Sequence, residues 1–384
     1  MKKEKIYKFL LIGLFALISI AVPVATIISS AQLPENAFSE NENRYLEKMP
    51  KFNFDTVTDK TFMTKFENYF SDRIVMREQW ISLMNDFDRL LGKKEIKGVF
   101  TEDGRMKQSW RESDYDKKSV SKNLAAMESF AQKYPKIKMY FMLAPNAQEI
   151  YSDTLPANCG AADQKLFIKD CYDSVPSITG IDVYSALSSA KNDYIYYRTD
   201  HHWTTLGAYY AYQQFCETLG LIPFDRDAHT AETCEDFYGT HYSKARTWNA
   251  EPDTITWYDL QNSLTVWNVT GPGQPAEGET TGLYDTDKLS VYDKYAMFLH
   301  GNNGLSRVEG DGEGKILVIK DSYANSFVPY LIANYAAIDV VDFRNYNYGL
   351  DQLIAANDYD QILVLYSYAS FTTDPYLYRA GVAG

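Results

Sequence analysis

Residues 315–334 read KILVIKDSYANSFVPYLIAN, and this stretch decides how the chain is expected to fold. Its first six residues are mostly apolar and β-branched, which is typical of a strand buried on both faces. Ser322 follows closely, and residues 323–334 have the apolar spacing of a helix. The stretch therefore predicts a strand over 315–320 that turns into a helix at Ser322.

The remainder of the C-terminal third repeats this alternation. Strands are predicted over 338–343 and 361–365, with a helix over 349–356. Strands that alternate with helices form a parallel sheet with helices on its faces. The predicted fold class is therefore α/β, with a parallel sheet flanked by helices.

The upstream chain supplies the other elements of such a fold. Helical spacing of apolar residues predicts three helices, at residues 60–91, 117–133 and 205–219. Short apolar runs predict three strands, at residues 98–100, 138–143 and 181–183. Residues 223–296 are rich in Thr, Asp, Gly and Trp and predict an irregular, β-rich insertion.

The composition of the 384 residues is that of a globular protein. The chain is 45% hydrophobic and 23% charged, which excludes disordered, collagen-like and multi-span membrane classes. Its net charge is −13, whereas nucleic-acid-binding domains normally carry the opposite sign. We therefore expect no nucleic-acid partner. The 31 tyrosines suit sugar-like ligands, and they equally suit half-buried strands.

The first 31 residues have the pattern of a membrane anchor or an export signal. Lysines in residues 1–8 precede an uncharged, mostly apolar run over residues 9–28, which as a helix would span about 30 Å, one bilayer core. Lysines before the span favour a cytoplasmic N-terminus. The alternative is a signal peptide cleaved near the small residues 29–31. Both place the rest of the chain outside the cytoplasm. The predicted order is a leader over 1–31, a polar stalk over 32–58 and a catalytic domain over 59–384.

The four cysteines fit an oxidising compartment. Pairing of sequence neighbours predicts the disulfides Cys159–Cys171 and Cys216–Cys234. The alternative is free thiols that are buried in the fold. No Cys-x-x-Cys motif or Cys–His spacing of a structural zinc site occurs in the sequence.

Residues 197–203, YRTDHHW, contain two of the five histidines. In an extended segment, Asp200 and His202 would share one side while His201 points away. A carboxylate beside an imidazole holds its tautomer and stabilises its charged form, as in Ser-His-Asp triads. The alternatives are a surface pair without function, and a metal site of Asp200, His201 and His202, which diverging histidines disfavour.

Ser322 is the candidate nucleophile. A strand that breaks into a helix lifts a hydroxyl to the C-terminal edge of a parallel sheet, where the ligand sites of α/β proteins gather. The helix N-terminus adds backbone N–H groups that stabilise an oxyanion. The alternative is that Ser322 is only an N-cap. Taken together, these segments predict a catalytic triad of Asp200, His202 and Ser322.

Four further residues are candidates for binding the substrate. Trp203 offers a flat face to a sugar ring, although such tryptophans more often lie in a core. Gly301 and Asn302 form a loop that either completes an oxyanion hole or is a tight turn. Arg344 follows a predicted strand and is a candidate ligand for an anionic or polar acceptor. Neither a metal nor an organic cofactor is predicted.

The block TDHHW at residues 199–203 resembles the signature of the DHHW family of exported bacterial proteins. That family is related to the alginate O-acetylation proteins, whose matching motif is Thr-Asp-x-His-Trp. Further blocks agree and extend the resemblance over most of residues 38–370. These blocks are FSENENRYL (38–46), FENYFSD (66–72), DFYGT (236–240) and KDSYANSF (320–327).

The resemblance implies an SGNH-hydrolase-like fold and acetyl transfer by Asp200, His202 and Ser322 to an extracellular polysaccharide. It also implies a multi-span membrane acyltransferase as the acetyl donor, because acetyl-CoA is absent outside the cell. Two positions depart from the relatives: Lys320 replaces the glycine of SGNH enzymes, and His201 replaces a small polar residue of the alginate proteins. These departures leave the acceptor's identity open.

Two other functions are compatible with the same sequence features. The first is a carbohydrate acetylesterase that uses the same three residues with water as the acceptor. The second is a non-catalytic cell-surface protein that binds polysaccharide and keeps only the fold, since a shared fold does not transfer function.

Overall fold

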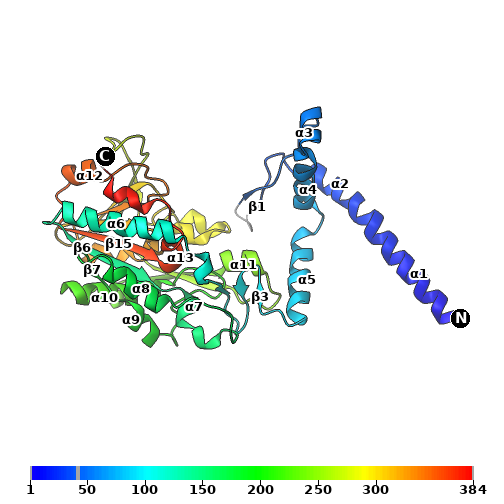
Figure 1. Ribbon diagram of the computed structural model, residues 1–384, viewed down its shortest axis with the longest axis horizontal. Coiled ribbons are helices and arrows are strands. Elements are labelled where there is room, and N and C mark those ends of the chain that lie inside the picture. Colours follow the sequence, from blue (N-terminus) through cyan, green and yellow to red (C-terminus); the bar gives the residue numbers. More distant parts are fainter. Residues whose placement is uncertain (1, 40–43, 383–384) are drawn as a thin grey trace. The chain divides into compact units, whose positions relative to one another are not determined.

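The computed structural model describes residues 2–39 and 44–382, with side chains from residue 5 onward. Residues 40–43 of the FSENENRYL block lie outside the described residues, as do the side chains of Lys2 and Lys3. The contacts divide the chain into two units, which are residues 1–93 with 245–248 and residues 94–244 with 249–384. The first holds the N-terminal helices and the second holds the main sheet (Figure 1).

The first unit begins with a long apolar helical segment. It consists of α1 (Lys2–Ala16), a π-helical turn (Leu17–Ala21) and α2 (Val22–Gln32). Over Lys5–Gln32 this segment is long and apolar enough to cross a membrane. A signal sequence near the N-terminus has the same length and composition, so the segment is compatible with both predicted leaders.

A two-stranded ribbon and three helices complete the first unit. They are β1 (Phe38–Ser39), β2 (Arg44–Tyr45), α3 (Phe54–Thr58), α4 (Thr61–Arg73) and α5 (Arg77–Leu90). The helical spacing over 60–91 belongs to two helices and not to one. The helix α4 ends at Arg73, Ile74 leaves the helical conformation with a ψ of 128°, and α5 begins after Met76, whose φ is +56°. Arg44 Nη2 lies 2.5 Å from Asp72 Oδ1, which joins two of the blocks quoted above.

The second unit is built on an eight-stranded sheet with the strand order β11-β10-β12-β14-β13-β15-β6-β7. Its strands are β6 (Lys138–Ala144), β7 (Thr179–Gly180), β10 (Ser263–Trp267), β11 (Glu279–Gly282), β12 (Leu305–Glu309), β13 (Lys315–Lys320), β14 (Ala337–Val341) and β15 (Gln361–Ser367). Every pair from β14 to β7 is parallel, whereas β12, β10 and β11 add an antiparallel edge. The predicted α/β class with a mostly parallel sheet is confirmed.

Helices cover both faces of this sheet. Figure 1 shows α6 (Lys117–Lys133) and α10 (Thr205–Leu219) on opposite sides of it. Ile316 and Val318 of β13 pack into the core that includes α10, whereas Leu317 and Ile319 pack into the core that includes α6. Burial on both faces explains why the strand is apolar throughout. The other helices are α7 (Ala147–Ile150), α8 (Gln164–Asp173), α9 (Tyr184–Ser189), α11 (Thr240–Ala245), α12 (Asp351–Ala356) and α13 (Tyr368–Phe371).

Smaller antiparallel sheets lie outside the main one. Their strands are β3 (Glu95–Ile96), β4 (Val99–Phe100), β5 (Lys107–Gln108), β8 (Ala231–Phe237) and β9 (Asp253–Tyr258). The segment 223–296, expected as an insertion, contains the strands β8, β9, β10 and β11. However, its strands β10 and β11 extend the main sheet, so this part of it is a continuation of the core structure.

Two local predictions are wrong. The helix expected over 323–334 is instead a pair of 3-10 helices, η8 (Ser322–Ser326) and η9 (Val328–Ala333). Pro329 explains why one continuous α-helix does not form, because in a helix interior proline lacks the N–H that bonds to the residue four before it and its ring clashes with that turn. In the structure Pro329 instead lies in the first turn of η9, where proline is tolerated. The strand expected over 181–183 lies earlier, at β7, and Val183 is the N-cap of α9.

The predicted disulfides are also wrong. All four cysteines lie in the described part of the chain, and all are free. Cys171 on α8 and Cys216 on α10 are buried in cores on opposite faces of the sheet. Burial raises the pKa of Cys171 to about 12 and that of Cys216 to about 11, so both thiols stay protonated and unreactive.

Candidate active site

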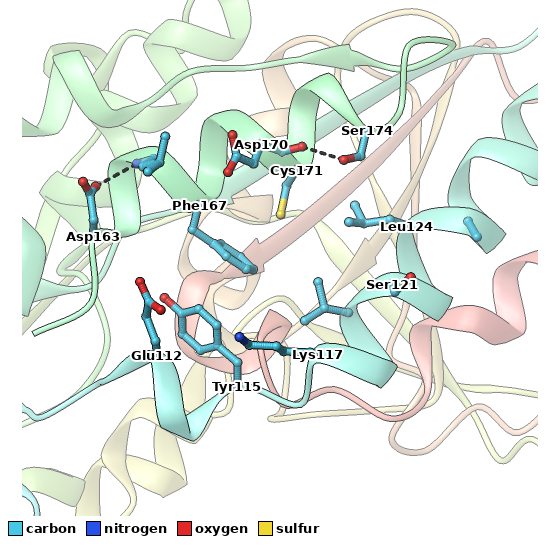
Figure 2. Close-up of a pocket in the computed structure, with 13 residues that line it drawn as sticks. Glu112, Tyr115, Lys117, Ser121, Leu124, Asp163, Phe167, Asp170, Cys171 and Ser174 are labelled. Atoms are coloured by element: carbon cyan, nitrogen blue, oxygen red, sulfur yellow. Dashed lines mark hydrogen bonds between the residues drawn. The ribbon is translucent and has the colours of Figure 1, made fainter.

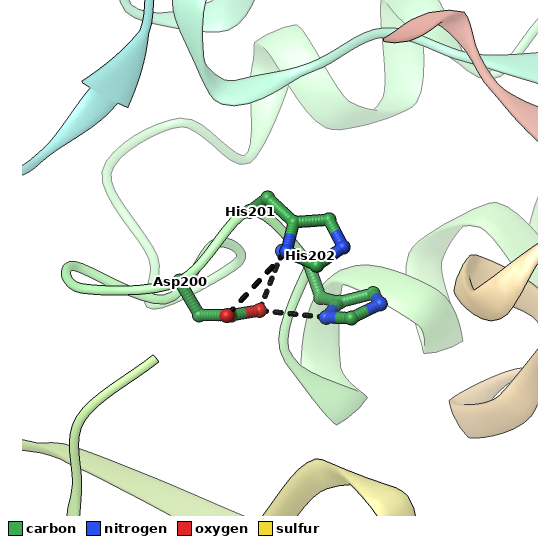
Figure 3. A group of neighbouring side chains, drawn as sticks. All are labelled: Asp200, His201 and His202. Carbon is green, nitrogen blue, oxygen red and sulfur yellow. Dashed lines mark hydrogen bonds and ion pairs between the residues drawn. The ribbon is translucent and has the colours of Figure 1, made fainter. Parts of the chain in front are cut away.

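The motif-bearing segment is a tight loop rather than a strand. Tyr196 and Trp203 pair as an antiparallel bridge, and the chain bends between them. The prediction that His201 points away from its neighbours is therefore wrong. Its Nδ1 lies 3.4 Å from Asp200 Oδ2, and its ring centroid lies 3.7 Å from that of His202 (Figure 3).

The loop meets the end of strand β13. His202 Nδ1 lies 2.6 Å from Asp200 Oδ1, and His202 Nε2 lies 2.7 Å from Ser322 Oγ. Ser322 follows β13 by two residues, so its hydroxyl stands at the C-terminal edge of the parallel strands. The three side chains predicted as a triad thus form one continuous chain of hydrogen bonds across 120 positions of sequence.

Asp200 is the most enclosed member of this chain, with 3% of its side chain exposed. Its Oδ1 also accepts from His202 N at 3.0 Å, and its Oδ2 accepts from Thr240 N at 2.8 Å and Thr240 Oγ1 at 3.1 Å. Burial opposes ionisation, but the charges and hydrogen bonds of His201 and His202 outweigh it. They hold the pKa of Asp200 well below its usual range, so the group is a carboxylate.

Gly239 makes this enclosure possible. A Cβ at that position would lie 2.2 Å from Asp200 Cβ and 2.3 Å from Asp200 Oδ2. Because such distances are far below van der Waals contact, only glycine allows the DFYGT block to close over the carboxylate. The block was part of the family resemblance, but its role becomes visible only in the structure.

His202 is a neutral base in this setting. Burial, together with the neighbouring His201, lowers the pKa of His202 to about 4, against the opposing effect of Asp200. Asp200 accepts a hydrogen bond from Nδ1–H of His202, so the lone pair of the ring lies on Nε2 and is directed at Ser322. The ring of Tyr295 stacks on the imidazole, with centroids 3.7 Å apart and planes inclined by 12°.

Further hydrogen bonds hold the turn that carries Ser322. The Asp321 carboxylate accepts from Tyr323 N at 2.9 Å, and the hydroxyl of Tyr323 donates to the His201 carbonyl at 2.5 Å. The hydroxyl of Tyr295 donates to the Ser322 carbonyl at 3.1 Å. The nucleophile's turn and the histidine loop are therefore tied together independently of the triad. Tyr295, Tyr323 and Thr240 were not predicted as site residues, since nothing in their local sequence pattern indicates these long-range contacts.

The predicted oxyanion loop is tied to the residues around Ser322. Lys320 is 1% exposed, and its Nζ donates to Asn302 Oδ1 at 2.8 Å and to Asn325 Oδ1 at 2.7 Å. Asn325 Nδ2 in turn donates to the Gly301 carbonyl at 3.4 Å. Lys320, which directly precedes Asp321 and Ser322 in the chain, thus anchors this loop. The role of Gly301 and Asn302 in binding an oxyanion stays a prediction.

Two predicted substrate ligands have other partners. Trp203 is fully buried, and its Nε1 donates to the Tyr323 carbonyl at 3.0 Å and to Ser326 Oγ at 3.1 Å. It belongs to the core, so the prediction of a sugar platform is wrong. Arg344, proposed as a ligand of the acceptor, is instead held by Asp342, with Nε 2.8 Å from Oδ1.

Asp200, His201 and His202 have possible metal-ligand atoms within 4.8 Å of one another. The histidines therefore do not diverge as the sequence argument assumed. Their Nδ1 atoms are already hydrogen-bonded, that of His201 to Thr240 Oγ1 at 2.7 Å and that of His202 to Asp200. The donor set is accounted for by this hydrogen-bonded network, and we assign no metal to it.

A cavity of about 340 Å³ adjoins the network. His201 and Thr240 form one wall of it, and the cavity is also lined by His241 and Lys244 of α11. A second cavity, of about 570 Å³, lies between α6 and α8 (Figure 2). Tyr115, Phe167 and Cys171 line this second cavity, and no member of the predicted triad does. No member of the triad lines the first cavity either, but His201 and Thr240 on its wall both contact Asp200. We therefore place the candidate site beside the first cavity.

The family of the chain follows from a match to a known protein family. Residues 108–341 match the model of the DHHW protein family, which is more than half of the chain. The chain belongs to the DHHW family. The predicted resemblance is thereby confirmed. No curated protein matches the chain.

Several solved structures are similar to this chain. A DHHW family protein from Eubacterium siraeum is 25% identical, with a TM-score of 0.63, covering 73% of this chain and 94% of that one. PatB1 from Bacillus cereus, solved with a sulfonyl adduct, is 17% identical with a TM-score of 0.58, covering 73% and 97%. The O-acetyltransferase domain of Pseudomonas putida AlgJ is 12% identical with a TM-score of 0.44, covering 73% and 94%. The DHHW chain thus shares the α/β fold of PatB1.

Proposed function

We propose that this DHHW protein is an extracytoplasmic serine O-acyltransferase that acetylates a cell-surface or secreted polysaccharide. The observation that carries the proposal is the 2.7 Å contact of Ser322 Oγ with His202 Nε2, continued at 2.6 Å from His202 Nδ1 to Asp200. Nucleophile, base and orienting carboxylate within hydrogen-bond distance are the signature of covalent acyl transfer.

In the first half of the reaction, Ser322 Oγ attacks the carbonyl carbon of an acetyl ester while its proton passes to His202 Nε2. The bond from the acetyl carbon to the leaving oxygen then breaks, and His202 returns the proton to that oxygen. The product is an acetyl ester on Ser322. Asp200 stabilises the imidazolium form of His202 between these two transfers.

In the second half, a hydroxyl of the acceptor attacks the acetyl-serine. His202 Nε2 takes the proton from that hydroxyl and returns it to Ser322 Oγ when the ester bond breaks. The backbone N–H of Ser322, and the loop of Gly301 and Asn302, are our candidates for binding the oxyanion. The Tyr323 N–H is not, because the Asp321 carboxylate already accepts from it.

The setting of the reaction follows from the N-terminal segment. We propose a leader over residues 1–31, a stalk over 32–58 and the catalytic domain within 59–384. The apolar helix Lys5–Gln32 would hold the domain at the outer face of the membrane, or direct its export if cleaved. The acetyl group would come from a multi-span membrane acyltransferase.

The test uses the full-length chain in detergent with p-nitrophenyl acetate as the donor. We expect a burst of p-nitrophenolate equal to the enzyme concentration, and a mass gain of one acetyl group on the peptide that contains Ser322. Ser322→Ala abolishes both. Ser177→Ala is the matched control, because its hydroxyl lies on the surface bonded to Glu128. A sulfonyl fluoride probe should modify the same serine, as the adduct in the PatB1 structure suggests.

Products then separate transfer from hydrolysis. The acetylated enzyme is presented with chitopentaose, cellopentaose or xylopentaose, and acetylated sugar is measured against free acetate. Acetate alone with a genuine Ser322 burst identifies an esterase. Binding of an oligosaccharide without any burst identifies a non-catalytic polysaccharide-binding protein and sinks the proposal.

A further inference from the structure

Asp200 serves two imidazoles, not one. Its Oδ1 is 2.6 Å from His202 Nδ1, and its Oδ2 is 3.4 Å from His201 Nδ1 (Figure 3). Thr240 bridges the second contact, because its Oγ1 donates to Asp200 Oδ2 and accepts from His201 Nδ1 at 2.7 Å. A Ser-His-Asp triad requires only one of these imidazoles, so the proposed mechanism leaves His201 without a role.

His201 also connects the triad to its surroundings. Its ring lies 3.7 Å from the ring of His202, and 35% of its side chain is exposed. It forms part of the wall of the 340 Å³ cavity. His201 is therefore open to protons from solvent, whereas only 6% of the His202 side chain is exposed.

We propose that His201 is a positioning residue that sets the strength of His202 as a base through their shared carboxylate. This inference rests on the proposed function. When His201 is neutral, the full charge of Asp200 stabilises the imidazolium that forms on His202 during acylation. When His201 is protonated, its positive charge interacts with the same carboxylate and lies beside the imidazolium of His202. The imidazolium is then less stable, and acylation is slower.

The charges around His201 fix the order of the two protonations. The titratable groups that act on it are Asp200, His202, His241, Lys244, Asp293 and Asp321. Burial disfavours protonation of His201, but Asp200 outweighs it, and the pKa of His201 is raised. The pKa of His202 is lowered to about 4, with the charge of His201 among the causes. As the pH falls, His201 is therefore protonated before His202. The loss of acylation rate at acidic pH, the acidic limb of the pH profile, is then set by protonation of His201.

The experiment measures the single-turnover acylation rate of the full-length chain with p-nitrophenyl acetate between pH 4.5 and 8.5. His201→Asn is the central variant, because its amide can still donate to Thr240 Oγ1 but carries no charge. We expect the acidic limb to move to lower pH by about one unit. At pH 5.5 the variant, scaled to its own plateau, then acylates up to about tenfold faster than the wild type.

Two further variants guard against a purely structural effect. His201→Ala should show the same shift in the limb with a lower plateau, since it also loses the contact with Thr240. Thr240→Val removes the hydroxyl that links Asp200 to His201. It should change the plateau of the acylation rate, whereas the acidic limb of the pH profile should still have the midpoint set by ionisation of His201. Thermal unfolding of each variant reports on folding separately from the pH profile.

The outcomes distinguish this inference from the proposed function. A wild-type chain that shows no burst at any pH removes both. A normal burst with the same limb midpoint in His201→Asn and the wild type overturns the inference alone. Loss of rate by one constant factor at every pH would show that His201 only supports the loop.

Discussion

Two polar residues at the same edge of the sheet, Ser322 and Arg344, differ in the kind of partner that they contact. Ser322 follows β13 and Arg344 follows β14, and these strands are parallel neighbours. Both residues are polar, and the sequence marks both as candidates for the site. Ser322 Oγ lies 2.7 Å from an imidazole that is 120 residues away in the chain, whereas Arg344 binds the carboxylate of Asp342, two residues away.

The difference shows that a place at the C-terminal edge of a parallel sheet is not enough to make a residue functional. Arg344 neutralises a carboxylate that is itself only 1% exposed and that also lies 3.3 Å from Lys320 Nζ. Its partner is local, and the pair stabilises the fold. Ser322 instead meets a neutral base with a poised lone pair, which only a distant loop supplies.

The largest expected effect concerns Ser322 and its direct partner. Ser322→Ala and His202→Ala should each lower the acylation rate with p-nitrophenyl acetate by about 10⁴-fold. The double variant should be no slower than the slower single variant, because the two residues act as one unit. Additive losses would show that the two side chains do not act as a unit.

Asp200→Asn should cost less, about 10³-fold, because nucleophile and base remain while the imidazole loses its charge partner and preferred tautomer. The measurement is again single-turnover acylation. Its control is the fluorescence-monitored unfolding curve, since Asn fits the cavity of Asp200. A loss below threefold would reduce Asp200 to a structural hydrogen-bond acceptor.

Gly239→Ala should act on the same carboxylate from the opposite side. Its Cβ would fall 2.2 Å from Asp200 Cβ, so the block must shift, and we expect about a tenfold slower acylation and about 2 kcal/mol lower stability. Gly282→Ala on β11 is the matched control, because its Cβ would have no neighbour within 4 Å. Equal behaviour of the two variants contradicts the close packing described for Asp200.

Arg344→Met should have the smallest effect, and it tests directly whether Arg344 differs from Ser322 in having no part in the reaction. We expect acylation within twofold of the wild type and a loss of about 1 kcal/mol in urea unfolding, because Asp342 keeps Lys320 as a partner. The reverse result, unchanged stability with tenfold weaker transfer to an oligosaccharide, would restore Arg344 as a ligand of the acceptor.

Much of the fold was predictable because its signals are local. The apolar runs of β6, β13 and β15 are buried on both faces, and such burial leaves its mark in the composition of each strand. The boundaries were less accurate, because the short break over residues 74–76, which includes the left-handed Met76, separates α4 from α5 without changing the apolar spacing.

The candidate site was predictable in its members and less so in its arrangement. Asp200, His202 and Ser322 stood out because few other residues offered that chemistry. The contacts of Tyr295 and Thr240 had no local signal, since each depends on a segment brought in from elsewhere. The fate of Trp203 was equally hidden, because an exposed platform and a core residue have the same local sequence.

The class of fold, the strand before Ser322 and the family of the chain could be inferred from the order of its amino acids. The spacing of apolar residues and the short motifs indicate these properties, and each segment of the chain contains these signals independently of the others. Three features emerge only when the chain is folded: His201 turns toward Asp200, the four thiols stay apart, and Arg344 binds its near neighbour Asp342. Each of these depends on how distant segments pack, and packing energies arise between segments rather than within them.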